Sequence, residues 1–201
     1  RDPDIHYGTN PCSEIILRPN QFCNLSTIVL KPEDTVVSIK KKIEIATIIG
    51  TVQSMFTNFP YLSSDWQKNC EEERLLGVSL TGIMDNNLTN GKADEAWRDD
   101  SLRGYVNTKM VLETLKNVAI ETNKEWADKL GIPVSAAITC VKPSGTVSQL
   151  VSSASGIHAR HNDHYIRTVR GDNKDPLTQF LIEQGIHNEP DVMKPDSTTV
   201  F

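Results

Sequence analysis

Residues 131–146, with the sequence GIPVSAAITCVKPSGT, decide the fold class. The opening Gly-Ile-Pro is a stop signal for the long helix predicted over Asp100 to Leu130, where apolar side chains recur at helical spacing. Ala136 to Val141 is short, apolar and β-branched, which predicts a strand leading straight into the turn Pro143 to Thr146. A further helix is expected from Thr146 to about Ser153. Helix, strand, loop and helix in this order favour an α/β architecture.

The same patterns of apolar spacing and turn residues predict the other elements of the chain. They are extended or loop structure over 1–32, a helix from Ser38 to about Asn58, a helix or turn entering a buried apolar segment over Glu71 to Met84, a loop over Asn86 to Ala93, a strand over Tyr165 to Val169 and a short helix over Asp175 to Glu183. Long helices alternating with short buried strands favour parallel strands. Residues 196–201 look like the start of a strand, so we expect the chain to be an internal piece of a longer protein.

Composition excludes several classes of protein. The 201 residues carry 21 basic and 26 acidic side chains, a net charge of −5, which argues against binding along a nucleic-acid backbone. No apolar run approaches the ~18 residues of a membrane span. The first residues show no charged-then-apolar pattern, so we expect no signal peptide among them. Four scattered cysteines do not form a disulfide framework, so we expect a reducing, cytoplasmic location.

The segment Asn10-Pro11-Cys12-Ser13-Glu14 carries the most chemistry. If it is extended, alternate residues face the same side, and the Asn10 amide, the Cys12 thiol and the Glu14 carboxylate form one row. Such a row can move a hydrogen or a proton and hold a hydroxyl group. The commoner interpretation is a packed cysteine beside a surface glutamate. The presence of Cys23 favours the interpretation that Cys12 is reactive, because two cysteines joined by a turn can meet across adjacent strands.

The turn from Pro143 to Thr146 predicts an anion site. A short strand ends, Gly145 lets the backbone approach a ligand, and the N–H groups of a helix start are exposed. The hydroxyls of Ser144, Thr146 and Ser148 could add donors. An ordinary helix cap is the simpler alternative.

His158, His161 and His164 lie at three-residue steps, but no cysteine pair accompanies them, so no metal site is expected. A polar loop lining a cleft is the favoured interpretation. Arg160 either contacts phosphate there or lies on a solvated face.

Five segments together resemble the ribonucleotide reductases. They are Asn10 to Ile15, Gln21 to Ser26, Gly77 to Met84, Lys142 to Ser148 and Ala154 to His161. The sequences of these segments are most similar to those of the adenosylcobalamin-dependent (class II) enzymes, and the resemblance runs from about residue 8 to about residue 171.

This resemblance implies that residues 1–201 are part of a catalytic domain, the ten-stranded α/β barrel of the family. A finger loop, about residues 8–26, would thread its centre, and a phosphate loop would lie at about 142–148. The implied reaction is thiyl-radical reduction of ribonucleoside triphosphates or diphosphates to 2′-deoxyribonucleotides for DNA synthesis. The implied partners are adenosylcobalamin, a thioredoxin-like reductant and a nucleotide effector bound outside this chain. Neither nucleic acid nor membrane is an expected partner, and the chain alone is expected to be inactive.

The resemblance also assigns roles to single residues. Cys12 matches the cysteine whose thiyl radical removes the ribose 3′-hydrogen, and Glu14 matches the carboxylate that accepts the 3′-hydroxyl proton. Asn10 matches the amide that hydrogen-bonds near the ribose hydroxyls and orients the carboxylate. Cys23 matches one of two cysteines whose oxidation reduces the sugar, the other lying N-terminal to the finger loop in the family. The residues matching the substrate-phosphate loop are Pro143, Ser144, Gly145 and Thr146.

Three alternatives remain open. The chain could be part of the large subunit of an iron-dependent (class I) reductase, which receives its radical from a second protein. Cys12 could instead be the nucleophile of a hydrolase or acyltransferase with a histidine base, and would then react with iodoacetamide at neutral pH. A non-catalytic structural piece is the third alternative, and the joint presence of Asn10, Cys12, Glu14 and Cys23 argues against it.

Overall fold

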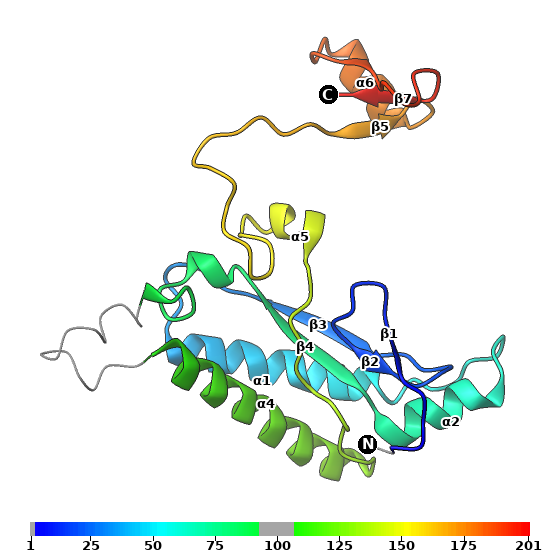
Figure 1. Ribbon diagram of the computed structural model, residues 1–201, viewed down its shortest axis with the longest axis vertical. Coiled ribbons are helices and arrows are strands. Elements are labelled where there is room, and N and C mark those ends of the chain that lie inside the picture. Colours follow the sequence, from blue (N-terminus) through cyan, green and yellow to red (C-terminus); the bar gives the residue numbers. More distant parts are fainter. Residues whose placement is uncertain (1–2, 93–106) are drawn as a thin grey trace, which may run out of the picture. The chain divides into compact units, whose positions relative to one another are not determined.

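The computed structural model describes residues 3–92 and 107–201. The chain divides into two compact units, Arg1–Arg160 and His161–Phe201, which are described separately (Figure 1). That residues 1–201 form part of one catalytic domain stays a prediction.

A parallel strand pair lies at the centre of the first unit. Strand β3 (Asn24–Val29) pairs along its whole length with β4 (Leu76–Thr81). The predicted strand Ala136 to Val141 runs beside β4 through backbone hydrogen bonds of 2.8 to 3.1 Å, but it forms only one β-bridge, between Val78 and Thr139. The predicted α/β class and parallel pairing are therefore confirmed in this unit.

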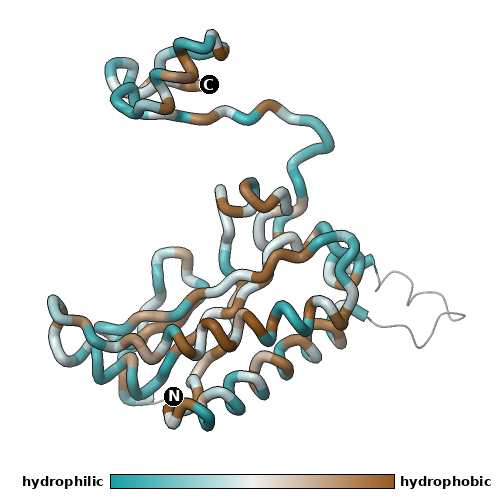
Figure 2. The backbone as a smooth tube through the Cα atoms, turned by 180° about the vertical axis from the view of Figure 1, so that it is seen from behind, coloured by the Kyte–Doolittle hydropathy of each residue, from teal (hydrophilic) through white to brown (hydrophobic). Residues whose placement is uncertain are grey.

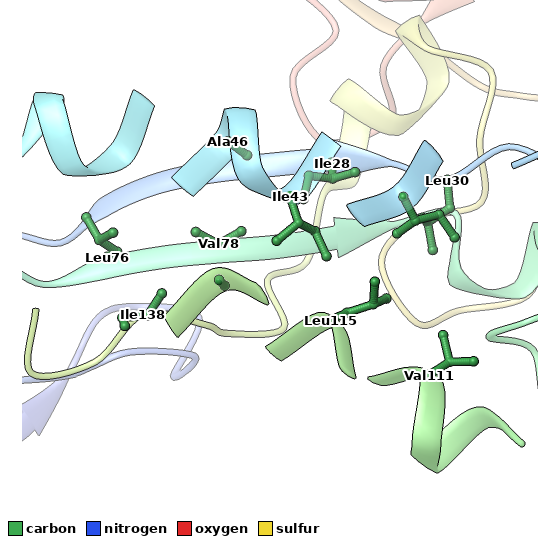
Figure 3. Close-up of a cluster of buried hydrophobic side chains, with 11 residues drawn as sticks. Ile28, Leu30, Ile43, Ala46, Leu76, Val78, Val111, Leu115 and Ile138 are labelled. Atoms are coloured by element: carbon green, nitrogen blue, oxygen red, sulfur yellow. The ribbon is translucent and has the colours of Figure 1, made fainter. Parts of the chain in front are cut away.

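Two long helices, α1 (Val36–Gln53) and α4 (Thr108–Leu130), cover one face of the strand pair (Figure 1). Residues two apart on a strand share a face, so the even-numbered residues of β3 and β4 point at the helices. Figure 2 shows hydrophobic stretches along the strands and α1. The buried core (Figure 3) consists of Ile28, Leu30, Ile39, Ile43, Ala46, Leu76, Val78, Val111, Leu115, Ala119 and Ile138. Burying one valine, leucine or isoleucine side chain of this core stabilises the fold by roughly 1.5–3 kcal/mol.

The helix predicted from Ser38 to Asn58 is confirmed as α1, with different ends. It begins after Thr35, whose hydroxyl accepts a hydrogen bond from the backbone N–H three residues later in a reciprocal capping box. It ends at Gln53 instead of about Asn58. The Ser54 hydroxyl donates to a carbonyl of the last turn, and the Arg74 guanidinium donates to the Ser54 carbonyl (2.6 Å). Side chains therefore take acceptors that a further turn would need.

The long helix predicted over Asp100 to Leu130 is confirmed as α4 from Thr108 onward, and residues 100–106 lie outside the described residues. The Asn107 side chain caps its N-terminus. Its last turn ends at Gly131 in the left-handed region (φ 66°), as the stop signal predicts. Neither α4 nor any other helix in the described ranges has the length and apolar character to span a membrane.

The segment predicted over Glu71 to Met84 contains three elements. Helix α2 (Ser64–Glu73) ends at Arg74, β4 supplies the buried apolar segment, and the short 3₁₀ helix η1 (Ile83–Asp85) follows. The loop predicted over Asn86 to Ala93 is confirmed as far as Gly91. Lys92 is already helical, and Ala93 lies outside the described ranges.

The second unit is a small antiparallel sheet with one helix. Its elements are β5 (Arg170–Asp172), α6 (Pro176–Glu183), β6 (Glu189–Pro190) and β7 (Thr198–Val200), with strand order β5-β7-β6. The predicted terminal strand and short helix are confirmed. The strand predicted over Tyr165 to Val169 is wrong, because pairing with β7 begins at Arg170 and only Val169 exchanges backbone hydrogen bonds with Phe201.

Candidate functional site

The segment around Cys12 is a tight hairpin. Strands β1 (Gly8–Thr9) and β2 (Ile16–Leu17) pair antiparallel, and Ser13 lies in the left-handed region at φ 61°. Asn10 closes the turn, since its side-chain oxygen accepts from the Ile15 N–H (3.0 Å) and its carbonyl from the Ser13 N–H (2.9 Å). The prediction of one extended row through Asn10, Cys12 and Glu14 is therefore wrong, because chain reversal at Ser13 breaks the strand alternation.

Cys12 and Glu14 nevertheless share a neighbour. Cys12 is exposed on the turn, whereas the Glu14 side chain is only 2 % exposed. Lys142, far along the chain, donates from Nζ to Glu14 Oε1 at 3.0 Å. The sulfur of Cys12 also lies close enough to Lys142 to act on its charge. The hairpin thus holds a buried carboxylate against one ammonium group, and an exposed thiol lies within electrostatic range of the same group.

The buried carboxyl of Glu14 is held ionised. Burial raises its pKa, but hydrogen bonds from its own backbone, from Lys142 and from the Asn10 amide outweigh burial, and the pKa is lowered. In the described part of the chain Oε2 makes no hydrogen bond of standard geometry. A buried acceptor oxygen of this kind is rare, and it is available to a ligand hydroxyl.

Lys142 is fixed by β4. Its backbone N–H donates to the hydroxyl of Ser79 at 2.8 Å, and Ser79 is fully buried. The pKa of Lys142 is raised, first by its hydrogen bond to Glu14 and, against the effect of burial, by smaller contributions from the sulfurs of Cys12 and Cys140. The ammonium is therefore a stable positive charge at the hairpin.

Two further thiols lie near this charge. Burial raises the pKa of Cys23 to about 12, assisted by Cys140 and Glu14, and burial raises the pKa of Cys140 to about 11, assisted by Glu14. At neutral pH both sulfurs keep their hydrogen, which makes them poor nucleophiles. They suit hydrogen-atom transfer better than acyl transfer.

Gly77 explains how these groups come close. A Cβ there would lie 2.4 Å from Leu25 Cδ2 and 3.2 Å from both Ile15 Cδ1 and Cys140 Sγ. Because residue 77 has no side chain, the hairpin and Cys140 pack directly on β4. The odd-numbered face of the strand pair therefore carries the site.

The predicted phosphate loop begins a short helix, α5 (Gly145–Leu150). Gly145 is exposed in the left-handed region (φ 45°) with open space around it, and Thr146 and Pro143 are exposed. The Ser144 hydroxyl bonds to the Thr81 hydroxyl (2.6 Å) and accepts from a backbone N–H, so it anchors the loop to β4. The Ser148 hydroxyl is not available as a donor, because it donates to the Gly145 carbonyl (2.6 Å).

Arg160 forms an ion pair with a carboxylate of the protein. It forms two 3.0 Å hydrogen bonds to Asp85, whose carboxylate also accepts from the Ala154 N–H at 2.7 Å. This pair ties the loop after α5 to η1. Over residues 3–92 and 107–201 no group of three or more histidine, cysteine, aspartate or glutamate side chains could hold a metal ion.

The sequence patterns missed Lys142 and Cys140 as members of the site. Both lie in the run Cys140-Val141-Lys142 that ends the predicted strand, and a charged residue directly after a buried strand is the signal that could have indicated Lys142. Nothing local pairs it with Glu14, since 128 positions separate the two.

Comparisons with known proteins show what the chain as a whole is similar to. No protein-family model matches the chain. It is similar to the adenosylcobalamin-dependent ribonucleoside-triphosphate reductase of Lactobacillus acidophilus, 29 % identical over 99 % of this chain and 28 % of that protein. The enzyme of the same name from Lacticaseibacillus paracasei is 29 % identical over 95 % and 27 %.

A solved structure, a B12-dependent (class II) ribonucleotide reductase, matches with a TM-score of 0.68 at 22 % identity, over 98 % of this chain and 29 % of that chain. The chain spans little more than a quarter of the length of these proteins. The resemblance to adenosylcobalamin-dependent ribonucleoside-triphosphate reductases that the motifs predict is therefore confirmed along almost the entire chain.

Proposed function

We propose that this chain is part of the catalytic chain of an adenosylcobalamin-dependent ribonucleotide reductase that reduces ribonucleoside triphosphates. The observation that carries the proposal is the buried, ionised Glu14, which has one oxygen on Lys142 and the other without a hydrogen-bond partner among the described residues. The thiol of Cys12 is exposed and interacts electrostatically with the same ammonium.

The roles follow from these positions. Cys12 takes the 3′-hydrogen of the ribose as a thiyl radical, because S–H and ribose C–H bonds are close in strength. Glu14 accepts the 3′-hydroxyl proton at Oε2, which helps the 2′-hydroxyl leave as water. The Asn10 amide orients this carboxylate. Cys23, with a second cysteine outside this chain, supplies the reducing electrons and becomes oxidised to a disulfide.

The hairpin and the segment that follows it into the start of β3, about residues 8–26, form the finger loop of the ten-stranded barrel in this proposal. Support comes from the packing of Ile15 on Gly77, at the face of β4 opposite the helices. The substrate phosphates bind at Pro143, Ser144, Gly145 and Thr146. Exposed Gly145 and Thr146 support this, with Ser144 holding the loop to β4.

The proposed cofactor is adenosylcobalamin, whose chemistry when bound is to generate the radical that Cys12 carries. The exposure of Cys12 fits that requirement, since a sealed thiol could not be reached. A thioredoxin-like reductant, an effector nucleotide bound outside this chain and a cytoplasmic location complete the proposal. All four cysteines are free thiols, which suits a reducing compartment.

The test is nucleotide reduction by the full-length protein with a chemical dithiol reductant. We expect deoxyribonucleotide formation that depends on added adenosylcobalamin and needs no iron-containing partner. Activity without adenosylcobalamin that requires an iron subunit would contradict the proposal and favour the class I alternative.

A further inference from the structure

Lys142 connects three parts of the first unit. Its backbone is held by Ser79 in β4, its side chain reaches Glu14 in the hairpin, and the next residue, Pro143, begins the proposed phosphate loop. A lysine this constrained differs from the exposed lysines of the helices, which end in solvent or in surface pairs.

Glu14 needs a cation at this position. Its side chain is 2 % exposed, and a carboxylate withdrawn from water reverts to the neutral acid unless a positive charge and hydrogen bonds compensate. The described groups that face it are the Lys142 ammonium, the Asn10 amide and the thiols of Cys23 and Cys140. Of these groups, the ammonium supplies the positive charge.

The two carboxylate oxygens of Glu14 also differ in their hydrogen-bond partners. Oε1 receives the ammonium at 3.0 Å, whereas Oε2 has no hydrogen-bond partner in the described ranges. One oxygen is thus fixed by protein and the other is left for an incoming hydroxyl.

We propose that Lys142 is a positioning residue of the reductase reaction: it keeps Glu14 as a carboxylate, fixes Oε1, and leaves Oε2 to take the 3′-hydroxyl proton. This inference rests on the proposed function, because it assigns Glu14 the role of proton acceptor. Lys142 itself touches neither the ribose nor the transferred hydrogen.

The experiment uses the full-length protein with Lys142→Met, Lys142→Arg and a control, Lys124→Met, at an exposed position of α4. Two quantities are measured against pH: 3′-hydrogen exchange from labelled substrate, and the carboxyl stretching band of Glu14, assigned by subtracting the spectrum of Glu14→Gln. The band follows the protonation of Glu14 whether or not the enzyme turns over.

We expect Lys142→Met to raise the pKa of Glu14 by about one unit or more, because an opposite charge at this distance lowers a carboxyl pKa by roughly 1–3 units. The acidic limb of the exchange profile moves up by the same amount, so exchange on that limb falls about tenfold or more. Lys142→Arg keeps the charge, so its Glu14 pKa and its exchange profile should stay close to those of the wild type. Lys124→Met should change neither the pKa nor the profile.

An unchanged Glu14 pKa in Lys142→Met, or Lys142→Arg as impaired as Lys142→Met, overturns the proposal. Lys142→Gln lacks the charge but keeps a hydrogen-bond donor for Oε1, so it is measured in parallel to guard against misfolding of Lys142→Met, and the same rise in the pKa of Glu14 is expected. A wild-type Glu14 that titrates above the ordinary glutamate range overturns the proposal without any variant. Failure of the proposed function gives a different pattern: wild-type protein shows no 3′-hydrogen exchange while the band still responds to Lys142→Met. That pattern overturns the role in catalysis and leaves only the ion pair.

Discussion

The two faces of the β3–β4 pair differ in what packs on them. The even-numbered face carries Ile28, Leu76 and Val78 against α1 and α4, where the contacts of these side chains are apolar. The odd-numbered face carries Gly77 and Ser79, and on it lie the hairpin and the run from Cys140 to Lys142. The same two strands therefore support a hydrocarbon core on one side and thiols, a carboxylate and an ammonium on the other.

This difference teaches where stability and chemistry reside in the first unit. Apolar burial has no directional requirement, so the apolar core on the helical face should tolerate exchanges between apolar side chains of similar volume. The opposite face depends on individual hydrogen bonds and on a missing Cβ, so single atoms matter there. Changes on the first face should alter the free energy of unfolding, and changes on the second should alter the reaction.

The largest effect is expected from Cys23→Ser in the full-length protein. Hydrogen abstraction by Cys12 continues, but the ribose is not reduced and multiple turnover is lost, because one of the two thiols that supply the electrons is missing. Product formed per enzyme molecule, measured beside 3′-hydrogen exchange, checks this. Cys70→Ser is the control, because that buried sulfur accepts a hydrogen bond from Phe22 (3.3 Å) and has no role in the proposed reaction. Normal multiple turnover by Cys23→Ser would show that its role is wrongly assigned.

On the helical face, Leu115→Ala is expected to lower the free energy of unfolding by about 3 kcal/mol. Leu115 is 2 % exposed and lies in the core, whereas Leu112 on the same helix is 39 % exposed and serves as the control in Leu112→Ala. Urea unfolding of the full-length proteins measures both, and activity per folded molecule should be unchanged. Equal losses from the two variants would contradict the placement of the core.

Gly77→Ala sharpens the comparison, because it adds one methyl group to the site face. The new Cβ would lie 2.4 Å from Leu25 and 3.2 Å from the Cys140 sulfur, so we expect a loss of about 2 kcal/mol in unfolding free energy. A simultaneous fall in 3′-hydrogen exchange is also expected, as Ile15 is pushed outward. Gly8→Ala is the matched control, since a Cβ there meets nothing within 4 Å. Identical behaviour of the two variants would argue against tight packing at Gly77.

The smallest effect concerns the ion pair of Asp85 and Arg160. Burial raises the pKa of Asp85, but the hydrogen bonds from Arg160 and Ala154 outweigh it, and the pKa is lowered. A lowered folded-state pKa means that the pair stabilises the protein above the ordinary aspartate pKa and that this contribution is lost as the pH falls through the folded-state value. Arg160 is half exposed, so the gain is about 1 kcal/mol or less.

Unfolding free energies of wild type and Asp85→Asn, compared between neutral and acidic pH, check this. The wild type should be the more stable at neutral pH, and the difference should vanish in acid. A difference that grows toward acid would reverse the assigned sign.

Local structure was predictable where the chain carries its own signals. The helix stop at Gly131 and the cap at Asp175 act over a few residues, and both helix ends are confirmed. The end of α1 was misplaced because Arg74, which comes from a distant segment, takes the Ser54 carbonyl. The strand near Tyr165 was misplaced because partner choice in a sheet depends on β7 and not on local propensity.

The site was predictable only in part, for the same physical reason. The residue types at Cys12, Glu14 and Cys23 are visible in the sequence, but their geometry depends on the left-handed Ser13 and on a lysine 128 positions away. Long-range ion pairs leave no periodic pattern. Resemblance to a family could therefore indicate which residues react, and the structure adds how the carboxylate is held.

The most direct test of the central claim is 3′-hydrogen exchange by full-length Cys12→Ser. Substrate labelled with tritium at the ribose 3′ position is incubated with adenosylcobalamin, and tritium release to water is followed for wild type and variant. We predict release by the wild type and none by the variant, because a serine O–H bond is too strong to exchange hydrogen with the sugar. Release by Cys12→Ser at a rate near that of the wild type would contradict the account.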